Sequence, residues 1–463
     1  MKNNSPDDTI AALSTPIGEG GISIARLSGP KALMIADAVF ASKDKDKPSK
    51  FKTYTVHYGH IVDEKNRVVD EVLLTVMKAP KSYTKEDVVE INCHGGIQAA
   101  KRALELILER GARLAEPGEF TKRAFLNGRL DLAQAEAVLD VIRSKTEGSL
   151  KVAMSQLDGG LSNKVNAILD SMIDAASQIE ASIDFPEEDI EIIENSGLVK
   201  KVEGVIRGLQ DLVRTYRSGA VLREGVLAII CGKPNVGKSS LMNLLLNRDR
   251  VIVSPIPGTT RDAVEEVINL KGVPVRLVDT AGIADAKDAL DKEGVKRSKK
   301  YLDLADIVIL VLDGSTAIGK EDLDIIKLAL GKKKIVVINK SDLPKKTDAK
   351  KAKKFFKDDK IVEISVGKRR NIGTLEKELL GAVWSGEYDQ GESAVVANAR
   401  HKELLDRALD NMLSVKKALA KRTPCELVAV DLKEALYHLG LIVGKSVSDD
   451  ILDRIFEQFC IGK

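Results

Sequence analysis

The sequence predicts a multidomain protein of α/β and α structure, in which an α/β domain is inserted into a discontinuous helical domain that follows an N-terminal α+β domain. Length is the first observation, because 463 residues make about three domains at roughly 100–200 residues per domain. The second is a stretch, residues 222–384, in which short apolar runs alternate with helix-length segments. The third is helical apolar periodicity on both sides of that stretch. Insertion of this kind is tolerated when the ends of the inserted domain lie close together.

The N-terminal domain is expected to span residues 1–120. β-Branched residues are concentrated in strand-like stretches at residues 22–27, 54–62, 69–77 and 87–92. An apolar stripe that begins at Ile97 and recurs at helical spacing predicts one clear helix, and Gly111 occupies the position of its C-cap. This combination of strands and a helix indicates an α+β domain.

Apolar residues at helical spacing fill residues 121–221, which we expect to form the first part of the helical domain. Leu126, Leu130 and Ala133 begin the pattern, and it is broken at residues 159–160 and near Pro186. The second part is expected over residues 385–463. Such stripes are typical of the core of a helix bundle.

The inserted α/β domain is expected over residues 222–384. Its apolar runs are strand-sized and are separated by helix-length segments, which is typical of a parallel sheet with helices on both faces. The predicted strands comprise residues 226–231, 273–278, 307–312, 335–338 and 361–364.

The sequence GKPNVGKS at residues 232–239 matches the phosphate-binding pattern GxxxxGK[ST], and it lies between a predicted strand and a helical pattern. The glycines let backbone N–H groups turn toward one centre, and the following helix adds its positive N-terminal end. Lys238 is expected to reach the β- and γ-phosphates and Ser239 to ligate Mg²⁺. The other residues expected around the nucleotide here are Asn235, Val236, Gly237 and Ser240. Alone, this motif also fits an ATPase.

The second motif is DTAG at residues 279–282, which follows the next predicted strand. We expect Asp279 to hold the Mg²⁺ shell and the Gly282 N–H to contact the γ-phosphate, with Thr280 and Ala281 beside them. Thr259 and Thr260 lie between the two motifs, where a switch threonine belongs. Thr260 is the expected second protein ligand of Mg²⁺.

Base recognition is predicted at NKSD, residues 339–342, which also follows a predicted strand. Asp342 can accept hydrogen bonds from guanine N1–H and the exocyclic amine, a donor pair that adenine lacks, and a mispaired carboxylate is costly. Asn339 and Lys340 belong to the same loop. Ser365, Val366 and Gly367 resemble the last base-contacting loop. In this order and at strand ends, the motifs predict a Ras-like P-loop α/β GTPase domain.

The group that orients the attacking water differs from the Ras pattern, because Gly282 is followed by Ile283 instead of Gln. The carboxylates available downstream are Asp285, Asp288, Asp291 and Glu293. No arginine finger is evident, although Arg261 lies beside the switch threonines. A bound cation could supply the missing positive charge.

Composition excludes several classes of protein. The four Cys are far apart and the five His form no cluster with zinc spacing, so neither a disulfide scaffold nor a structural zinc is expected. The first residues lack the apolar region of a signal peptide, and no apolar run approaches 18 residues, so we expect a soluble cytoplasmic protein with no membrane partner. Lysine runs at residues 332–334 and 350–354 could contact phosphates, although a solvated face is the commoner meaning of such runs.

Several segments outside the GTPase motifs carry a resemblance to a known family. They are DTIAA at residues 8–12, GGISIARLSG at 20–29, YTKEDVVEINCHGG at 83–96, PGEFTKRAFLNGRLDL at 117–132 and CIGK at 460–463. In these segments and in the GTPase motifs, the chain resembles the tRNA-modification GTPase MnmE (TrmE) family from end to end. The resemblance implies an N-terminal domain that binds folate and dimerises, a discontinuous helical domain and the inserted GTPase domain.

The resemblance also implies a reaction. Family members act with MnmG (GidA), a partner protein that carries FAD. The two proteins form a heterotetramer that modifies certain tRNAs. An aminomethyl or carboxymethylaminomethyl group is added at C5 of the wobble uridine, with ammonium or glycine as nitrogen donor. The carbon comes from a tetrahydrofolate derivative, in the 5-formyl or 5,10-methylene form.

By the same resemblance, residues that match Arg26, Glu90, Arg129 and Lys463 contact the folate, and Cys460 lies beside it with a possible chemical role. The family's GTPase uses K⁺, and the matching ligands are Asn235, Ser254, Ile256 and Thr259. Its water-positioning Glu falls at Asp291, one methylene shorter, and Glu293 is the alternative.

Two other functions remain open from the sequence. One is a ribosome-assembly or RNA-binding GTPase switch without modification chemistry. Such proteins often append a KH domain with a GXXG loop, and no GXXG occurs after residue 384. The other is a standalone folate-dependent one-carbon enzyme that GTP regulates.

Overall fold

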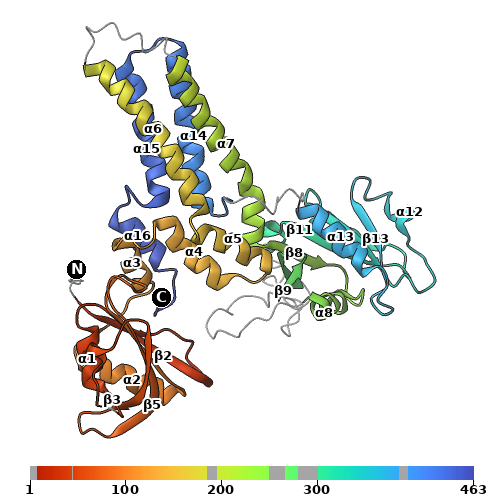
Figure 1. Ribbon diagram of the computed structural model, residues 1–463. Coiled ribbons are helices and arrows are strands. Elements are labelled where there is room, and N and C mark those ends of the chain that lie inside the picture. The colour runs from red at the N-terminus through yellow and green to blue at the C-terminus, as the bar shows by residue number, and fades with distance from the viewer. Residues whose placement is uncertain (1–7, 44, 185–195, 250–265, 280–300, 385–394) are drawn as a thin grey trace. The chain divides into compact units, whose positions relative to one another are not determined.

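The computed structural model describes residues 8–43, 45–184, 196–249, 266–279, 301–384 and 395–463 (Figure 1). These residues divide into two compact units, of which unit 1 is Met1–Leu139 with Gly440–Lys463 and unit 2 is Asp140–Leu439. Each unit has hydrophobic clusters of its own. The multidomain α/β and α class predicted from the sequence is confirmed.

Unit 1 contains a sheet whose described strands follow the order β3-β4-β5-β6-β2-β1-β7. Neighbouring strands are antiparallel, except that β1 and β7 are parallel. The strands predicted in this region coincide with β2, β4, β5 and β6. The bounds are β1 Ile10–Leu13, β2 Gly20–Ser28, β3 Phe40–Ser42, β4 Thr55–Val62, β5 Val68–Met77, β6 Val88–Gly95 and β7 Arg113–Leu114.

One face of this sheet is covered by α1 (Ala32–Val39) and α2 (Ile97–Glu109), the latter being the predicted helix. Strand β5 shows why one face is buried, since Val72, Leu74 and Val76 pack into the core while Leu73, between them, is 48% exposed. This alternation is the pattern of an antiparallel sheet with one covered face.

The last residues of the chain complete unit 1. Helices α3 (Glu119–Leu126), α4 (Leu132–Arg143) and α16 (Asp449–Phe456) share a cluster of apolar side chains. After α16, Ile461 forms an antiparallel bridge with Pro117. Gly462 has φ of 95°, and a Cβ there would lie 2.3 Å from the Leu13 carbonyl oxygen, so this position requires glycine.

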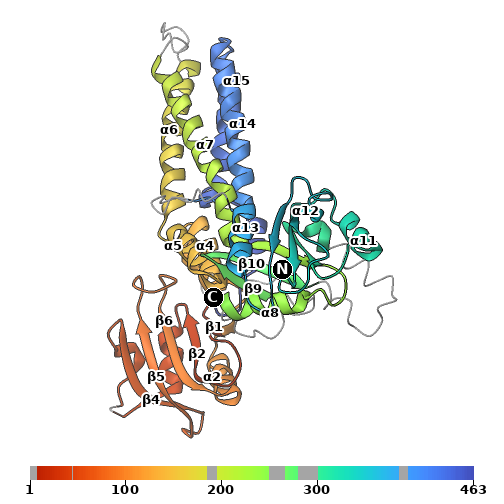
Figure 2. The same ribbon diagram turned by 90° about the vertical axis from the view of Figure 1, so that its right-hand side faces the viewer.

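The helical part of unit 2 consists of α5 (Glu147–Leu157), α6 (Gly160–Asp184), α7 (Ser196–Glu224), α14 (Ala399–Ala420) and most of α15 (Cys425–Val443). Figures 1 and 2 both show α6, α7, α14 and α15 side by side along a bundle. The α/β part lies between α7 and α14 in the chain, as predicted. None of the described helices combines the length and apolarity that a membrane crossing requires.

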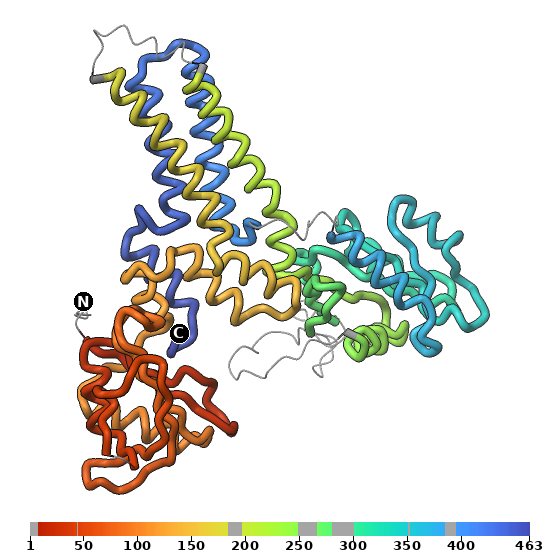
Figure 3. Tube along the Cα trace, in the orientation of Figure 1, coloured from red at the N-terminus to blue at the C-terminus, as the bar shows by residue number. Residues whose placement is uncertain are grey.

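The α/β part of unit 2 is a sheet whose described strands follow the order β13-β12-β11-β8-β10-β9, and its course can be followed in Figure 3. Alternate residues of β8 pack on opposite faces, Ala228 and Ile230 on one and Leu227 and Ile229 on the other, so both faces are covered. The strands are β8 Val226–Cys231, β9 Glu266–Leu270, β10 Val273–Asp279, β11 Ile307–Asp313, β12 Lys334–Asn339 and β13 Lys360–Glu363. The helices are α8 Lys238–Asp249, α11 Lys320–Leu328, α12 Ala349–Ala352 and α13 Ile372–Val383.

All the strands predicted in this domain are present and mutually parallel, but β9 was not predicted and pairs antiparallel with β10. A tight turn joins β9 to β10, with positive φ at Lys271 (51°) and Gly272 (93°). Two successive positive φ angles match the twist of a two-residue hairpin, which explains the antiparallel edge.

Candidate functional site

The predicted phosphate-binding loop connects β8 to α8, which begins at Lys238. Gly237 has φ of 100°, and a Cβ there would lie 2.4 Å from Asn339 Nδ2, so a larger residue would displace the neighbouring loop. The Lys238 side chain is 7% exposed, and its Nζ donates to the Lys233 main-chain oxygen at 3.0 Å. Ser240 lies in the first turn of α8, with its side chain exposed. The loop thus has the strand–loop–helix setting of an anion site at a helix N-terminus.

Two predicted magnesium-site residues meet where β8 and β10 end. The Ser239 hydroxyl donates to Asp279 Oδ2 at 2.7 Å. Because β8 and β10 are parallel neighbours, their carboxyl ends lie at the same edge of the sheet. Hydroxyl and carboxylate oxygens are hard ligands of the kind that Mg²⁺ prefers.

Asn339 joins three of the predicted nucleotide loops. Its buried side chain donates to the Val236 carbonyl oxygen at 2.8 Å and accepts from the Val366 N–H at 3.0 Å. The side chain of Ser365 is buried beside it, and Gly367 is exposed at the tip of the last loop. The phosphate loop and the two base loops are therefore held in one arrangement.

The predicted base-reading carboxylate, Asp342, is exposed next to these loops. Its Oδ1 accepts a hydrogen bond from the Ser365 hydroxyl at 2.5 Å. This hydrogen bond is the main reason that the pKa of Asp342 lies below its ordinary value. The carboxyl group is consequently an ionised acceptor at neutral pH, which suits the two guanine donors.

Sequence reasoning missed Asp313, the last residue of β11. Its carboxylate is 2.7 Å from Lys340 Nζ, which also donates to the Asn235 carbonyl oxygen at 2.9 Å. Burial opposes ionisation of Asp313, but hydrogen bonds from Lys340 and Ser315 outweigh it and lower its pKa. An acidic residue directly after an apolar strand was the available signal.

Asp322 was also missed. This carboxylate is 3% exposed at the start of α11, and its Oδ2 is 2.9 Å from Lys233 Nζ in the phosphate loop. It also accepts the Gly319 N–H at 2.9 Å, as a helix cap would. Both missed carboxylates fix lysines of the nucleotide loops.

Several predicted site residues lie outside the described residues. They are Ser254, Ile256, Thr259, Thr260, Arg261, Thr280, Ala281, Gly282, Ile283, Asp285, Asp288, Asp291 and Glu293. The second Mg²⁺ ligand, most of the K⁺ ligands and the candidates for positioning water therefore stay predictions. Asn235, the remaining K⁺ candidate, is exposed at the loop tip with φ of 64°.

The predicted folate residues come together in unit 1. Arg26 on β2 forms an ion pair with Glu90 on β6, with Nε 2.7 Å from Oε1, and its Nη1 donates to the Gly462 carbonyl oxygen at 3.2 Å. The guanidinium carbons of Arg26 and Arg129 lie 5.9 and 4.8 Å from the centroid of the Tyr83 ring. Sequence reasoning did not assign a role to Tyr83, although it begins one of the matching segments.

The C-terminal residues border the same place. Burial, and then the nearby Arg26 charge, lower the pKa of the Lys463 amine. The Phe120 N–H donates to the main-chain oxygen of Lys463 at 3.2 Å, and the Gly118 N–H donates to that of Cys460 at 3.3 Å. The Cys460 thiol is exposed. The arrangement combines cationic donors, a carboxylate and aromatic faces, which suits a flat heterocycle with carboxylate groups.

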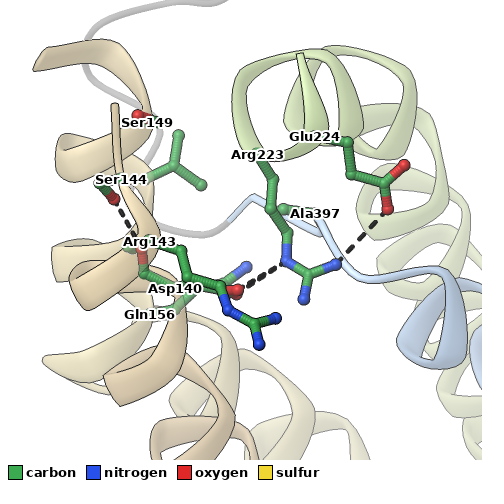
Figure 4. Close-up of a pocket in the computed structure, with 10 residues that line it drawn as sticks. Asp140, Arg143, Ser144, Ser149, Gln156, Arg223, Glu224 and Ala397 are labelled. Carbon is green, nitrogen blue, oxygen red and sulfur yellow. Dashed lines mark hydrogen bonds and ion pairs between the residues drawn. The ribbon is translucent and has the colours of Figure 1, made fainter. Parts of the chain in front are cut away.

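A cavity of about 180 Å³ in unit 2 lies apart from these residues (Figure 4). It is lined by α4, α5 and the end of α7. Arg223 Nε is 2.8 Å from both carboxylate oxygens of Asp140, and Arg223 Nη1 is 3.5 Å from Glu224. Arg223 is therefore neutralised by Asp140 and Glu224. The cavity lies at a junction between helices and has no features of a nucleotide site.

Comparisons with known proteins cover nearly the whole chain. The family model described as GTP-binding protein TrmE N-terminus matches residues 9–129, and the MnmE helical domain model matches residues 132–460. The chain is 48% identical over 458 residues to the tRNA modification GTPase MnmE of Alkaliphilus oremlandii, covering 99% of each chain. It is 49% identical over 461 residues to that of Carboxydothermus hydrogenoformans, covering 99% of this chain and 100% of the relative.

Among solved structures, the G domain of the T. maritima FeoB iron transporter is 26% identical, with 98% of that chain and 34% of this chain covered. Its TM-score of 0.28 adds nothing to the fold described above. The family is shown by the relatives of nearly equal length and by the two family models. The chain belongs to the MnmE family of tRNA modification GTPases.

Proposed function

We propose that this GTP-hydrolysing enzyme of tRNA modification acts with the FAD-dependent protein MnmG to add an aminomethyl or carboxymethylaminomethyl group at C5 of the wobble uridine, using a one-carbon unit from folate. Family membership supports the tRNA modification. The observation that carries the nucleotide site is the pair of bonds from Asn339 to Val236 and Val366, which fixes the phosphate and base loops together. The proposed assembly is a homodimer in the cytoplasm, bound to MnmG in a heterotetramer.

In the proposed GTP complex, each nucleotide loop has its own task. Lys238 turns from the Lys233 carbonyl oxygen to the β- and γ-phosphates. This movement needs only a rotation of its side chain. Asp342 accepts from guanine, while Lys340 is held by Asp313 against the phosphate loop. The backbone N–H groups around Gly237 surround the phosphates.

The residues present fit Mg²⁺, because the Ser239 hydroxyl offers an oxygen ligand and the Asp279 carboxylate beside it can hold the shell of the ion. Thr260 is the proposed second protein ligand. Bound there, the ion neutralises charge that develops on the transferred phosphoryl group. Ser239 and Asp279 orient it, and one of Asp291 and Glu293 is proposed to position the attacking water.

Potassium is predicted to accelerate GTP turnover. With KCl and NaCl at equal ionic strength, we expect turnover in KCl to be at least about tenfold faster, because one well-placed cation stabilises developing charge by several kcal/mol. The measurement is steady-state phosphate release at several protein concentrations, and a rise in specific activity with concentration would support dimerisation. Equal rates in the two salts would mean that Asn235, Ser254, Ile256 and Thr259 do not bind K⁺, while the GTPase assignment would stand.

The residues of unit 1 fit a folate. Arg26, Arg129 and Lys463 offer cationic donors to its glutamate carboxylates, and the partly buried Tyr83 offers a ring that already lies near the guanidinium groups of Arg26 and Arg129. Glu90 can accept from the amino group of the pterin ring. Cys460 is the proposed nearby thiol, and it is exposed for such a role. When bound, the folate supplies the one-carbon unit.

Substitution of Arg129 by alanine is expected to weaken binding of 5-formyltetrahydrofolate about ten- to hundredfold, because a hydrogen bond to a charged group contributes roughly 1.5–3 kcal/mol. The measurement is titration calorimetry on the full chain. Arg102→Ala is the matched control, since among the described residues Arg102 pairs with Glu105 and Glu109 on the surface of α2. Unchanged affinity in Arg129→Ala, or an equal loss in the control, would contradict the folate site.

A further inference from the structure

The segment between β12 and β13 concentrates positive charge on one side of the α/β part of unit 2. Residues 345–360, here called the lysine crossover, contain eight Lys and three Asp, a net charge of +5, whereas the whole chain carries +3. The crossover leaves the base loop after Leu343, passes through α12 and ends at the start of β13. Figures 1 and 2 show α12 at the periphery of this part.

The charges in the middle of the crossover are not neutralised. Lys350, Lys353, Lys354 and Lys357 are exposed, and within the described part of the chain none of them has an ion pair or hydrogen-bonded side-chain partner. At the ends of the crossover the lysines are paired, as Lys345 is with Glu363. Unpaired lysines in a row are the electrostatic footprint of a polyanion site.

An exposed aromatic ring lies among these lysines. Phe355 is 50% exposed, although the next residue, Phe356, is 1% exposed and packs in the core with Ile326 and Val336. Phe356 anchors the backbone in the core, so Phe355, which stands between Lys354 and Lys357 in the sequence, stays at the surface. An exposed aromatic ring in a lysine-rich segment is a combination that unpaired nucleic-acid bases can use for stacking.

The second lysine run is adjacent. Lys334 Nζ is 3.3 Å from Asp359 Oδ2, which brings the start of β12 beside the end of the crossover. Lys333, next to it, is exposed. The start of β12 and the end of the crossover therefore lie side by side, and the exposed ring of the crossover distinguishes it from the merely solvated face that the sequence favoured.

We infer that the lysine crossover is a contact surface for tRNA, in which its unpaired lysines bind backbone phosphates and Phe355 stacks on an unpaired base. RNA is the occupant that fits both features, because a polyanion alone would use the lysines and leave the ring in water. The inference rests on tRNA being the macromolecule that this family member modifies. It assigns no base-specific contact, so the affinity should depend strongly on salt and weakly on sequence.

The test is binding of the full chain to total deacylated tRNA by fluorescence anisotropy, over a series of KCl concentrations. The triple variant Lys350→Ala, Lys353→Ala, Lys354→Ala is expected to raise Kd at least about tenfold near 0.1 M salt, and to reduce the salt slope by about one for each lysine that contacts a phosphate. Phe355→Ala is expected to raise Kd about tenfold, and Phe355→Tyr to bind as the wild type does. GTP turnover should be unchanged in all of them.

A triple variant with the same change in net charge, Lys151→Ala, Lys164→Ala, Lys417→Ala, is the control, because these exposed lysines lie on the helices of unit 2. An equal loss in this control would show a general charge effect and overturn the inference, as would wild-type Kd values in the crossover variants. Loss of the flavoprotein's binding with tRNA affinity intact would make the surface a protein interface and would also overturn it. A wild-type chain that binds no tRNA would instead contradict the proposed function.

Discussion

Replacement of Lys238 by alanine is expected to lower kcat/KM for GTP hydrolysis about a thousandfold or more, which corresponds to about 4 kcal/mol of transition-state stabilisation. Lys238 is 7% exposed, so water screens its charge poorly. No other described lysine amine donates to the Lys233 carbonyl oxygen at the start of the loop. The measurement is steady-state phosphate release with saturating Mg²⁺, together with GTP affinity by fluorescent-analogue binding.

Lys233→Ala is the matched control because it removes a lysine from the same loop. The Lys233 amine forms an ion pair with the buried carboxylate of Asp322. Its loss should therefore lower kcat/KM by less than about tenfold. Wild-type turnover in Lys238→Ala, or equal losses in the two variants, would mean that the phosphates bind elsewhere.

Substitution of Asp342 by asparagine is expected to weaken GTP binding about a hundredfold or more and to give the protein a preference for xanthosine triphosphate. The carboxylate accepts two guanine donors, and asparagine replaces one acceptor with an amide donor that repels the exocyclic amine. Xanthine carries a carbonyl at that position and can accept from the new amide. The side chain of Ser365, which hydrogen-bonds Asp342, can also bond to asparagine, so the loop should keep its shape.

Competition between the two nucleotides on wild type and variant measures this change. Asp324→Asn is the control, because Asp324 is an exposed residue of α11 whose side chain, in the described part of the chain, pairs with Lys327. If the variant retains the GTP preference of the wild type, Asp342 does not read the base.

The fold could be predicted where a strong hydrophobic pattern marked an element in the sequence. The strand predicted at residues 226–231 coincides with β8, since all six of its residues are buried and read as a continuous apolar run. Strand β1 was missed because its sequence, IAAL, has neither alternation nor β-branched enrichment. Strand β9 was missed because it pairs with β10 through the turn at Lys271 and Gly272. That turn needs a positive φ at Lys271, which a lysine in the sequence does not indicate.

The candidate nucleotide site was predicted through residues that occur in short motifs, such as Lys238 and Asn339. Asp313 and Asp322 could not be found in this way, because each acts through an ion pair with a lysine 27 or 89 positions away in the sequence. The same holds for Tyr83, whose ring meets Arg129 only after the loop before β6 has folded beside α3. Tertiary contacts between distant segments carry no local sequence pattern.

We propose above that this chain takes part in modifying the tRNA wobble uridine and uses its GTPase to do so. The most direct test is mass spectrometry of tRNA nucleosides from a strain that lacks the gene, complemented with the wild type or with Lys238→Ala. We expect the aminomethyl or carboxymethylaminomethyl group at C5 to disappear on deletion, to return with the wild type and not to return with the variant. Unchanged nucleosides after deletion would contradict the account, and full restoration by Lys238→Ala would separate the modification from GTP hydrolysis.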